Sequence, residues 1–369
     1  MTGRKTMNKI NMAEMYSDDE IKNKTVSILD SGRYIKGEEN QKFEEEFARF
    51  CGSNSAVIVN SGTNALILAL KSLGIGPGDE IIVPSHTFIA TANAVLFIGA
   101  KPVFADINPE NYTISPDDIR SKVNKATKAV IPVHIYGHPC DMDEICEIAE
   151  EKDLCVIEDA CQSHGAEYKG RKTGSIGDIA AFSFFPSKNM TVSGDGGAIT
   201  VRDPEVAEIA AAIRDQGRRD GSKYFHEFPG LNLRLSEIHA AIGRIQLRHL
   251  PEWNMKRREN AAFFSSKLDL DGIVVPKEES WAKAVYHQYV IRIKDREGLQ
   301  KHLSEKGIAT GIHYPIPVHM QPVMAPYAKG EALQVTEGIA DEILSIPVHP
   351  FLSSAEREYI AESITEYFR

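Results

Sequence analysis

The sequence contains no apolar run long enough to cross a membrane, so we expect neither a membrane span nor a membrane partner. Its first twenty residues carry no signal-peptide core. The five cysteines are odd in number and none has CxxC spacing, which argues against a disulfide framework and a zinc ribbon. We therefore expect a protein of the reducing cytoplasm that holds no metal.

An excess of positive charge is also missing. The chain has 42 Lys and Arg against 52 Asp and Glu, and a formal net charge of −10 argues against a nucleic-acid partner. Two glycine patterns are absent: GxGxxG after the first predicted strand, and GxxxxGK[ST] anywhere. Nicotinamide and P-loop nucleotide sites therefore lack the turn that they require.

The order of the expected elements predicts an α/β fold. Between residues 56 and 157 short continuous apolar runs alternate with helical segments, which is typical of a parallel sheet covered on both faces. From about residue 234 a long amphipathic helix is expected, and Pro251 is expected to start another helix. Short strands, one of them over 309–313, and further helices follow. We predict a large domain over 1–250 with a mostly parallel, helix-flanked sheet and N-terminal helices, and a smaller α+β domain over 251–369.

Ligands of such sheets gather at the carboxyl ends of the strands, where three polar groups fall. Gly62 and Thr63 stand between a strand and a helix, where phosphate binds readily, although taken alone an ordinary helix cap explains them better. Asp159 ends another strand and is either a turn cap or a partner for a protonated heterocyclic nitrogen. Lys188 lies in a Pro- and Gly-rich loop after a third strand. Desolvation there would lower the pKa of its amine, and a neutral amine can attack a carbonyl.

Together these three groups are the parts needed to hold pyridoxal phosphate: a phosphate turn, a carboxylate for the ring nitrogen and a lysine for the aldehyde. The sequence also resembles a known family, the DegT family of nucleotide-sugar aminotransferases, which are pyridoxal-phosphate enzymes of the aspartate aminotransferase fold. The resemblance runs from about residue 10 to the end of the chain. It is carried by the stretches SGTNALILALKSLGIGPGDEIIVPSHTFIATANAV, GAKPVFADINPENYTISP, TKAVIPVHIYGHPCDMDEI, VIEDACQSHGAEYKGRKTGSIGDIAAFSFFPSKNMTVSGDGGAIT and GLNLRLSEIHAAI.

The resemblance implies roles for the residues around the cofactor ring. Lys188 in FFPSKN matches the lysine that forms the Schiff base with pyridoxal 5'-phosphate, and Asp159 in IEDA matches the partner of the pyridine nitrogen. Gln162 matches the neighbour of the ring hydroxyl, and Phe88 in SHTF falls where an aromatic ring stacks on the cofactor. His164 also matches a family position, for which ring contact and core packing both remain open.

Other matches concern the phosphate and the second subunit. Gly62 and Thr63 match backbone and side-chain phosphate contacts, as does Ser183 in AFSF. Asn232 in GLNLRL matches a phosphate ligand that the second subunit of a homodimer contributes. The resemblance therefore implies a dimer with shared active sites.

The resemblance implies that the protein transfers an amino group from an amino acid to a nucleotide-linked keto sugar, and glutamate is the expected donor. Lys188 favours this activity, since family dehydratases carry histidine at the matching position. Residues 311–317 and 345–350 look like those of members that aminate a 3-keto sugar, in which the residues matching Arg234, His313 and Tyr314 reach the substrate. For His313, a structural histidine at a strand end is the alternative. A family dehydratase and a cofactor-binding regulator without turnover remain alternative functions.

Overall fold

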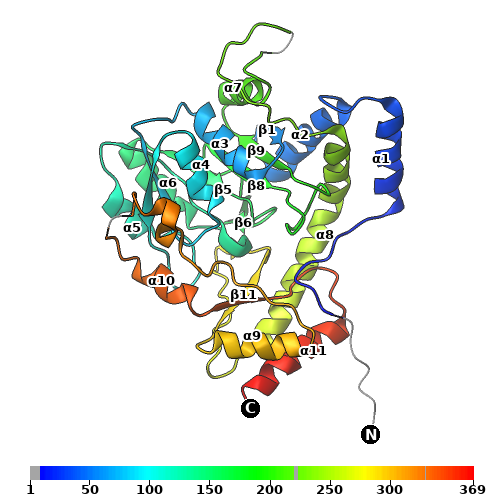
Figure 1. The fold of residues 1–369 in the computed structure, drawn as a ribbon, viewed down its shortest axis with the longest axis vertical. Coiled ribbons are helices and arrows are strands. Elements are labelled where there is room, and N and C mark those ends of the chain that lie inside the picture. The colour runs from blue at the N-terminus through cyan, green and yellow to red at the C-terminus, as the bar shows by residue number, and fades with distance from the viewer. Residues whose placement is uncertain (1–8, 220–222, 329) are drawn as a thin grey trace.

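The computed structural model describes residues 9–219, 223–328 and 330–369. A seven-stranded sheet forms the centre of the larger part of this chain, in the order β1-β9-β8-β5-β4-β2-β3 (Figure 1). Neighbours from β8 to β3 are parallel, whereas β9 runs antiparallel to both β1 and β8. The prediction of a mostly parallel sheet is thus confirmed. The strands are β1 Ser55–Val59, β2 Glu80–Pro84, β3 Lys101–Ala105, β4 Thr127–Val130, β5 Cys155–Asp159, β8 Ile179–Ser183 and β9 Gly197–Val201.

Helices cover both faces of this sheet, which explains why its strands read as continuous apolar runs. In β2, Ile81 and Val83 pack on one face while Ile82 packs on the other. The first face lies under α3, α4 and α7, and the second under α2, α5, α6 and α8 (Figure 1). These helices and the first one are α1 Asp19–Ser31, α2 Glu38–Cys51, α3 Gly62–Ser72, α4 Ala90–Phe97, α5 Pro116–Lys122, α6 Met142–Lys152, α7 Pro204–Arg214 and α8 Glu237–Lys267.

The C-terminal part of the chain has its own apolar core. Two antiparallel strands, β11 and β12, pack with α9, α11 and the second half of α8. Ile10, from the N-terminal segment, forms a bridge with Ile308 and is buried in this core. A small three-stranded sheet, β10-β6-β7, connects this part to the large sheet region. The remaining elements are β6 Glu167–Tyr168, β7 Arg171–Lys172, β10 Ala282–Lys283, β11 Tyr289–Arg292, β12 Ile343–Ile346, α9 Arg296–Glu305, α10 Gln334–Ala340 and α11 Ser354–Tyr367, with short 3-10 turns at Ile135–Gly137, Val318–Met320 and Pro322–Met324.

Two expectations about secondary structure are wrong. Pro251 does not start a helix, because α8 runs through it as one helix of 31 residues. The helix buries Leu250 and Trp253 on either side of the proline, and this packing outweighs the backbone hydrogen bond that proline removes. Residues 309–313 form no strand but only a single bridge from Gly311 to Ser345. A domain boundary at residue 250 stays a prediction, and it falls inside α8.

Candidate active site

A cavity of about 390 Å³ opens where the carboxyl ends of the parallel strands meet residues from the C-terminal part. Nine of the residues singled out from the sequence line it, and they come from five separate segments of the chain. They are Gly62, Thr63, Phe88, Asp159, Gln162, Ser183, Lys188, His313 and Tyr314. The fold thus brings together side chains up to about 250 positions apart.

Lys188 lies in the loop that follows β8, where its backbone N–H donates to the Phe185 carbonyl at 2.8 Å. The next residue, Asn189, is buried, and its side chain donates to the Asn254 side chain at 2.9 Å and to the Val285 carbonyl at 3.0 Å. The loop is therefore tied to α8 and to the C-terminal part. Burial in the cavity lowers the pKa of the Lys188 amine, while the neighbouring Cys161 and Asp159 act in the opposite direction.

Asp159 is the last residue of β5, and its side chain is 5% exposed. One carboxylate oxygen accepts a hydrogen bond from the Thr91 hydroxyl at 2.8 Å, and the other accepts from the backbone N–H of Cys161 at 3.2 Å. Two donors from different elements therefore hold the carboxylate in one orientation at the cavity wall. Such a group can keep a proton on a basic nitrogen placed against it.

The turn predicted to bind phosphate lies at the start of α3. Ser61 caps this helix by accepting from the Asn64 N–H at 3.2 Å, so the helix begins at Gly62. A Cβ atom at Gly62 would lie 2.7 Å from the Ser183 Cβ and 3.2 Å from the Cys161 Sγ, so only glycine fits. The N-terminal amide groups of the helix, the hydroxyl of Thr63 and that of Ser183 together form a cradle suited to an anion.

Aromatic and polar side chains also line the cavity. The ring of Phe88 is 52% exposed, and its centroid lies 5.7 Å from that of Tyr314. The Gln162 amide donates to the Tyr314 hydroxyl at 3.4 Å. His313 Nδ1 lies 2.8 Å from the Ser345 hydroxyl, and burial, assisted by the charge of Lys188, lowers the pKa of His313 to about 4. His313 is therefore neutral at pH 7.

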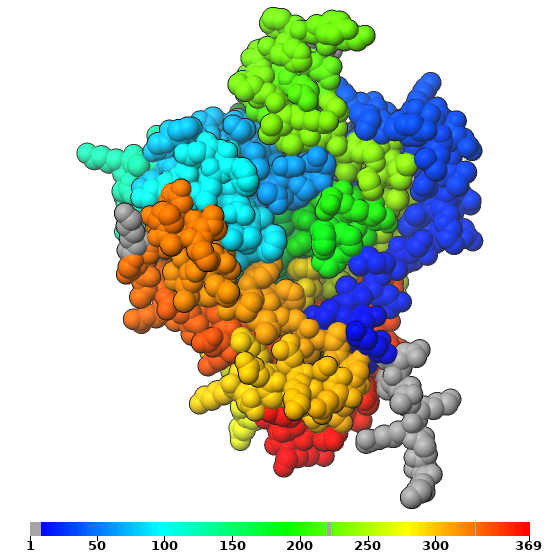
Figure 2. Space-filling model, in the orientation of Figure 1, coloured from blue at the N-terminus to red at the C-terminus, as the bar shows by residue number. Residues whose placement is uncertain are grey.

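Asn232 and Arg234 do not line this cavity. The Arg234 guanidinium pairs with Asp215, and Asn232 is exposed. They follow residues 223–231, part of a lobe that projects from the top of the molecule (Figure 2), where Tyr224 is 82% exposed. Their participation in a site shared with a second subunit stays a prediction.

His164 lies outside the cavity lining. Its ring is fully buried, 5.5 Å from that of Phe182 and 5.8 Å from that of Phe184. Burial, with a contribution from Lys188, lowers its pKa to about 3. Of the two interpretations left open, this placement favours core packing.

Sequence reasoning missed several residues of the site. Thr91 orients Asp159, and its position one helical turn after Thr87 at the start of α4 is the only sequence signal for it. Cys161, His287 and Gln288 also line the cavity. Since His287 and Gln288 lie about 100 residues beyond Lys188 in sequence, no local pattern connects them to it. In the described ranges, no cluster of three or more His, Cys, Asp or Glu could hold a metal ion, and no helix is long and apolar enough to cross a membrane.

Fold and cavity together define an α/β enzyme class in which a strand-end lysine, a strand-end carboxylate and a helix N-terminus face one site. Residues 15–365 match the family model described as the DegT/DnrJ/EryC1/StrS aminotransferase family. The chain belongs to this family, which confirms the resemblance seen in the sequence.

Two relatives illustrate the range of names among similar proteins. The chain is 44% identical, over 92% of its length and 90% of the relative, to a dTDP-3-amino-3,4,6-trideoxy-alpha-D-glucose transaminase of Streptomyces venezuelae. It is 40% identical to a protein of Geobacillus stearothermophilus named pleiotropic regulatory protein, over 98% of each chain.

Solved structures agree with the fold. The S. venezuelae protein DesV, in complex with a ketimine intermediate, superposes with a TM-score of 0.95 at 41% identity, covering 98% of this chain and 99% of that one. The Bacillus subtilis protein NtdA, with bound cofactor PMP, gives a TM-score of 0.92 at 30% identity, covering 100% of this chain and 86% of that one. The predicted fold class is thus confirmed.

Proposed function

We propose that the protein is a pyridoxal-phosphate-dependent aminotransferase that moves an amino group from glutamate to a nucleotide-linked keto sugar, with Lys188 and Asp159 as its catalytic residues. The single observation that carries this proposal is the meeting of the Lys188 amine, the fixed Asp159 carboxylate and the glycine-requiring start of α3 in one cavity. Family membership supports the reaction class, and the PMP-bound relative supports the cofactor.

The residues present fit the cofactor. Residue 62 must be glycine, because a Cβ there would clash with Ser183. Since glycine has no side chain to cover its backbone N–H, a phosphate can approach this N–H closely, with Thr63 and Ser183 beside it. Asp159 would hold the protonated ring nitrogen, and Phe88 offers an exposed ring face for stacking. When bound, pyridoxal phosphate accepts the amino group, draws electrons from the carbon that loses a proton, and then gives the amino group up.

Lys188 has two tasks in this reaction. Its amine, with the pKa lowered by burial, binds the cofactor aldehyde in the resting enzyme. Once displaced by the donor, its Nζ takes the proton from the amino-bearing carbon of glutamate and later supplies a proton to the sugar carbon. Because the lysine stays tethered within the cavity, it does both without diffusing. Over the full cycle glutamate and keto sugar become 2-oxoglutarate and amino sugar.

The acceptor side of the cavity is assigned to His313 and Tyr314, and Gln162, the proposed neighbour of the cofactor ring hydroxyl, is bonded to Tyr314 beside them. Neutral His313 and the Tyr314 hydroxyl can exchange hydrogen bonds with sugar hydroxyls without adding charge. A 3-keto sugar is the proposed acceptor, because residues 311–317 resemble members that aminate this position. Several relatives carry names that contain a 3-amino or 3-oxo sugar nucleotide, including those at 44% and 39% identity.

A homodimer with shared sites is part of the proposal. Asn232 and Arg234 follow the projecting lobe. Asn232 is exposed and so available to a second copy of the chain, whereas Arg234 is partly buried and pairs with Asp215. The large exposed aromatic rings of Tyr224 and Phe225 on this lobe fit burial against a partner. The described cysteines are all free thiols, which fits the cytoplasm that we propose as its location.

The deciding experiment incubates the purified protein with glutamate and a panel of dTDP- and UDP-linked 3-keto and 4-keto sugars, followed by mass spectrometry. We expect an amino sugar and 2-oxoglutarate in equal amounts. Borohydride reduction of the resting enzyme followed by peptide mapping should label Lys188, and an unlabelled Lys188 would refute its role.

The same experiment separates the alternatives. A dehydratase would give a deoxysugar without consuming glutamate. A regulator without turnover, which the name of the G. stearothermophilus relative brings to mind, would bind the cofactor and convert no sugar at all. Lys188, at the position where family dehydratases carry histidine, favours amino transfer over dehydration.

A further inference from the structure

Tyr136 lies behind the acceptor wall of the cavity, the segment that carries His313 and Tyr314, and bonds both to this segment and to Gln162. It stands in the short turn Ile135–Gly137 after β4, is 6% exposed, and does not itself line the cavity. Its backbone N–H donates to the Gln162 side-chain oxygen at 2.8 Å, and its hydroxyl donates to the backbone carbonyl of His313. One residue therefore connects the segment after β5 with the segment that carries His313 and Tyr314.

A buried histidine completes this arrangement. His86 Nε2 lies 2.6 Å from the Tyr136 hydroxyl oxygen, and His86 is 2% exposed. A hydroxyl has one proton, which Tyr136 gives to the His313 carbonyl, so His86 must donate from Nε2. Burial lowers the pKa of His86 to about 4, so it is a neutral donor at pH 7. His86 comes from the segment that also supplies Phe88.

The backbone of Tyr136 shows that this placement is imposed by its surroundings. Its φ of 57° lies in the left-handed region, which side chains other than glycine rarely adopt and which costs on the order of 1 kcal/mol. The next residue, Gly137, could not carry a Cβ, which would lie 3.0 Å from the His287 nitrogen. Such strained positions persist only where several contacts hold them, as here.

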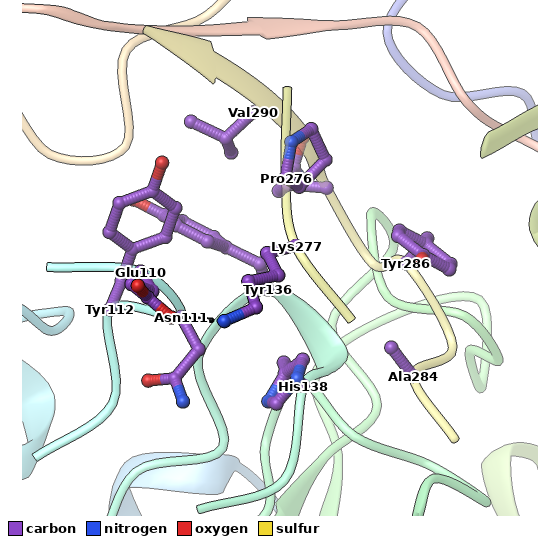
Figure 3. Close-up of a pocket in the computed structure, with 11 residues that line it drawn as sticks. Glu110, Asn111, Tyr112, Tyr136, His138, Pro276, Lys277, Ala284, Tyr286 and Val290 are labelled. Atoms are coloured by element: carbon purple, nitrogen blue, oxygen red, sulfur yellow. Dashed lines mark hydrogen bonds and ion pairs between the residues drawn. The ribbon is translucent and has the colours of Figure 1, made fainter. Parts of the chain in front are cut away.

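Among the residues that the structure describes, the side of Tyr136 that faces away from the active-site cavity holds no second ligand site that would explain its placement. A cavity of about 20 Å³, large enough for a water molecule but not for a ligand, separates residues 110–112 from the C-terminal part (Figure 3). The ring of Tyr112 stands there beside that of Tyr136, with centroids 5.9 Å apart. Tyr112 is also buried and also has a positive φ, and its ring packs near those of Tyr136 and His86. Its hydroxyl, however, interacts with Arg292 rather than with the His313 carbonyl.

We propose that Tyr136 is a positioning residue for the sugar: its hydroxyl, oriented by His86, holds the His313–Tyr314 segment against Gln162 and so fixes the acceptor wall. This inference rests on the proposed function, since it concerns the sugar half of the reaction. The bond to Gln162 comes from the backbone of Tyr136 and survives loss of the hydroxyl. The glutamate half should therefore be insensitive to that loss.

The test compares Tyr136→Phe with Tyr112→Phe, a matched control that also removes one buried hydroxyl from the same aromatic pair. Glutamate and a nucleotide-linked 3-amino sugar both convert the pyridoxal form to the pyridoxamine form, so one absorbance change follows both half-reactions. The probe is dTDP-3-amino-3,4,6-trideoxy-α-D-glucose, or the UDP- or dTDP-linked 3-amino sugar with which the wild type reacts fastest. Titration calorimetry with the same sugar gives its Kd for the cofactor-free protein, independently of turnover.

For Tyr136→Phe we expect the sugar half-reaction to slow by roughly tenfold or more and the sugar Kd to rise similarly, the usual cost of an unsatisfied buried carbonyl. Its glutamate half-reaction, and both halves in Tyr112→Phe, should stay within about twofold of wild type, well below the tenfold effect of that lost bond. Equal slowing of both halves in Tyr136→Phe, or no slowing of either, would overturn the proposal. If the wild type itself reacts with neither glutamate nor any sugar, the proposed function fails instead.

A second variant keeps the test decisive if Tyr136→Phe does not fold. His86→Phe keeps an aromatic ring but removes the donor to Tyr136, whose bond to His313 remains. The sugar half-reaction should slow selectively, by a smaller factor than in Tyr136→Phe. Equal slowing of both halves in His86→Phe would also count against the positioning role.

Discussion

Replacing Asp159 by Asn separates the charge of this side chain from its shape. The amide has the same size, and its oxygen can keep the hydrogen bond from Thr91. Its nitrogen would then face the Cys161 N–H, donor against donor, where the carboxylate accepts at 3.2 Å. We expect the folded protein to lose about 1–3 kcal/mol of stability from this mismatch.

The larger effect is on proton removal from glutamate. A carboxylate about 4 Å from a protonated ring nitrogen contributes roughly 4 kcal/mol at an effective dielectric constant of about 20, which corresponds to about a thousandfold in rate. Stopped-flow absorbance with saturating glutamate measures this half-reaction directly, provided that excess cofactor is added so that every site is occupied. We expect Asp159→Asn to bind the cofactor and to react about a thousandfold more slowly.

Asp195 supplies the matched control, because it is an exposed carboxylate on the rim of the same cavity. Solvent screens its charge, so Asp195→Asn should change the same rate by less than about tenfold. A rate for Asp159→Asn within tenfold of wild type would refute the assignment of Asp159 to the ring nitrogen. An equal loss in both variants would point to the general potential of the cavity instead.

Three further predictions follow from the same contacts. Gly62→Ala should weaken cofactor binding and lower the melting temperature, because overpacking against Ser183 costs about 1–3 kcal/mol of stability. Gly76→Ala, whose Cβ would meet no atom within 4 Å, should do neither. Unchanged cofactor affinity in a titration of Gly62→Ala would contradict the phosphate cradle. Folding lowers the pKa of Lys188, so the free-energy cost of burying its charge disappears as the pH rises towards the ordinary value of 10.5. In denaturant unfolding of the cofactor-free protein, Lys188→Met should therefore be more stable than wild type at pH 7, by a difference that shrinks by pH 10. A difference that does not change with pH would contradict this prediction. If Asn232 acts across a dimer, mixing the inactive variants Lys188→Ala and Asn232→Ala should restore activity to about a quarter of the sites, because one site of each mixed dimer then holds both intact residues. No recovery of activity in confirmed mixed dimers would place Asn232 in the site of its own subunit.

The sequence was informative wherever a local pattern has a local cause. Gly62 and Thr63 come shortly after an apolar strand that ends at Val59, and the structure begins α3 at Gly62. Asp159 could be placed at a strand end, and Lys188 in a loop after a strand, because the strands themselves are short apolar runs. The topology then dictates that these ends share one edge of the sheet.

The rest depends on tertiary contacts. Pro251 looks like a helix start, but the apolar residues on both sides of it bury against two cores and keep α8 continuous. Tyr136 is one aromatic residue among many in the sequence, and only the folded chain brings its hydroxyl to His313, 177 positions away. Nothing in the residues near Tyr136 encodes that bond.

The unbroken path of α8 has a consequence for how the molecule can be divided or moved. Leu247 and Leu250 belong to the core beneath the large sheet, while Ala261 and Phe264, a few turns later, belong to the C-terminal core. One rigid rod is therefore shared by both units. A chain cut after residue 250 would therefore expose apolar residues of α8 on both fragments.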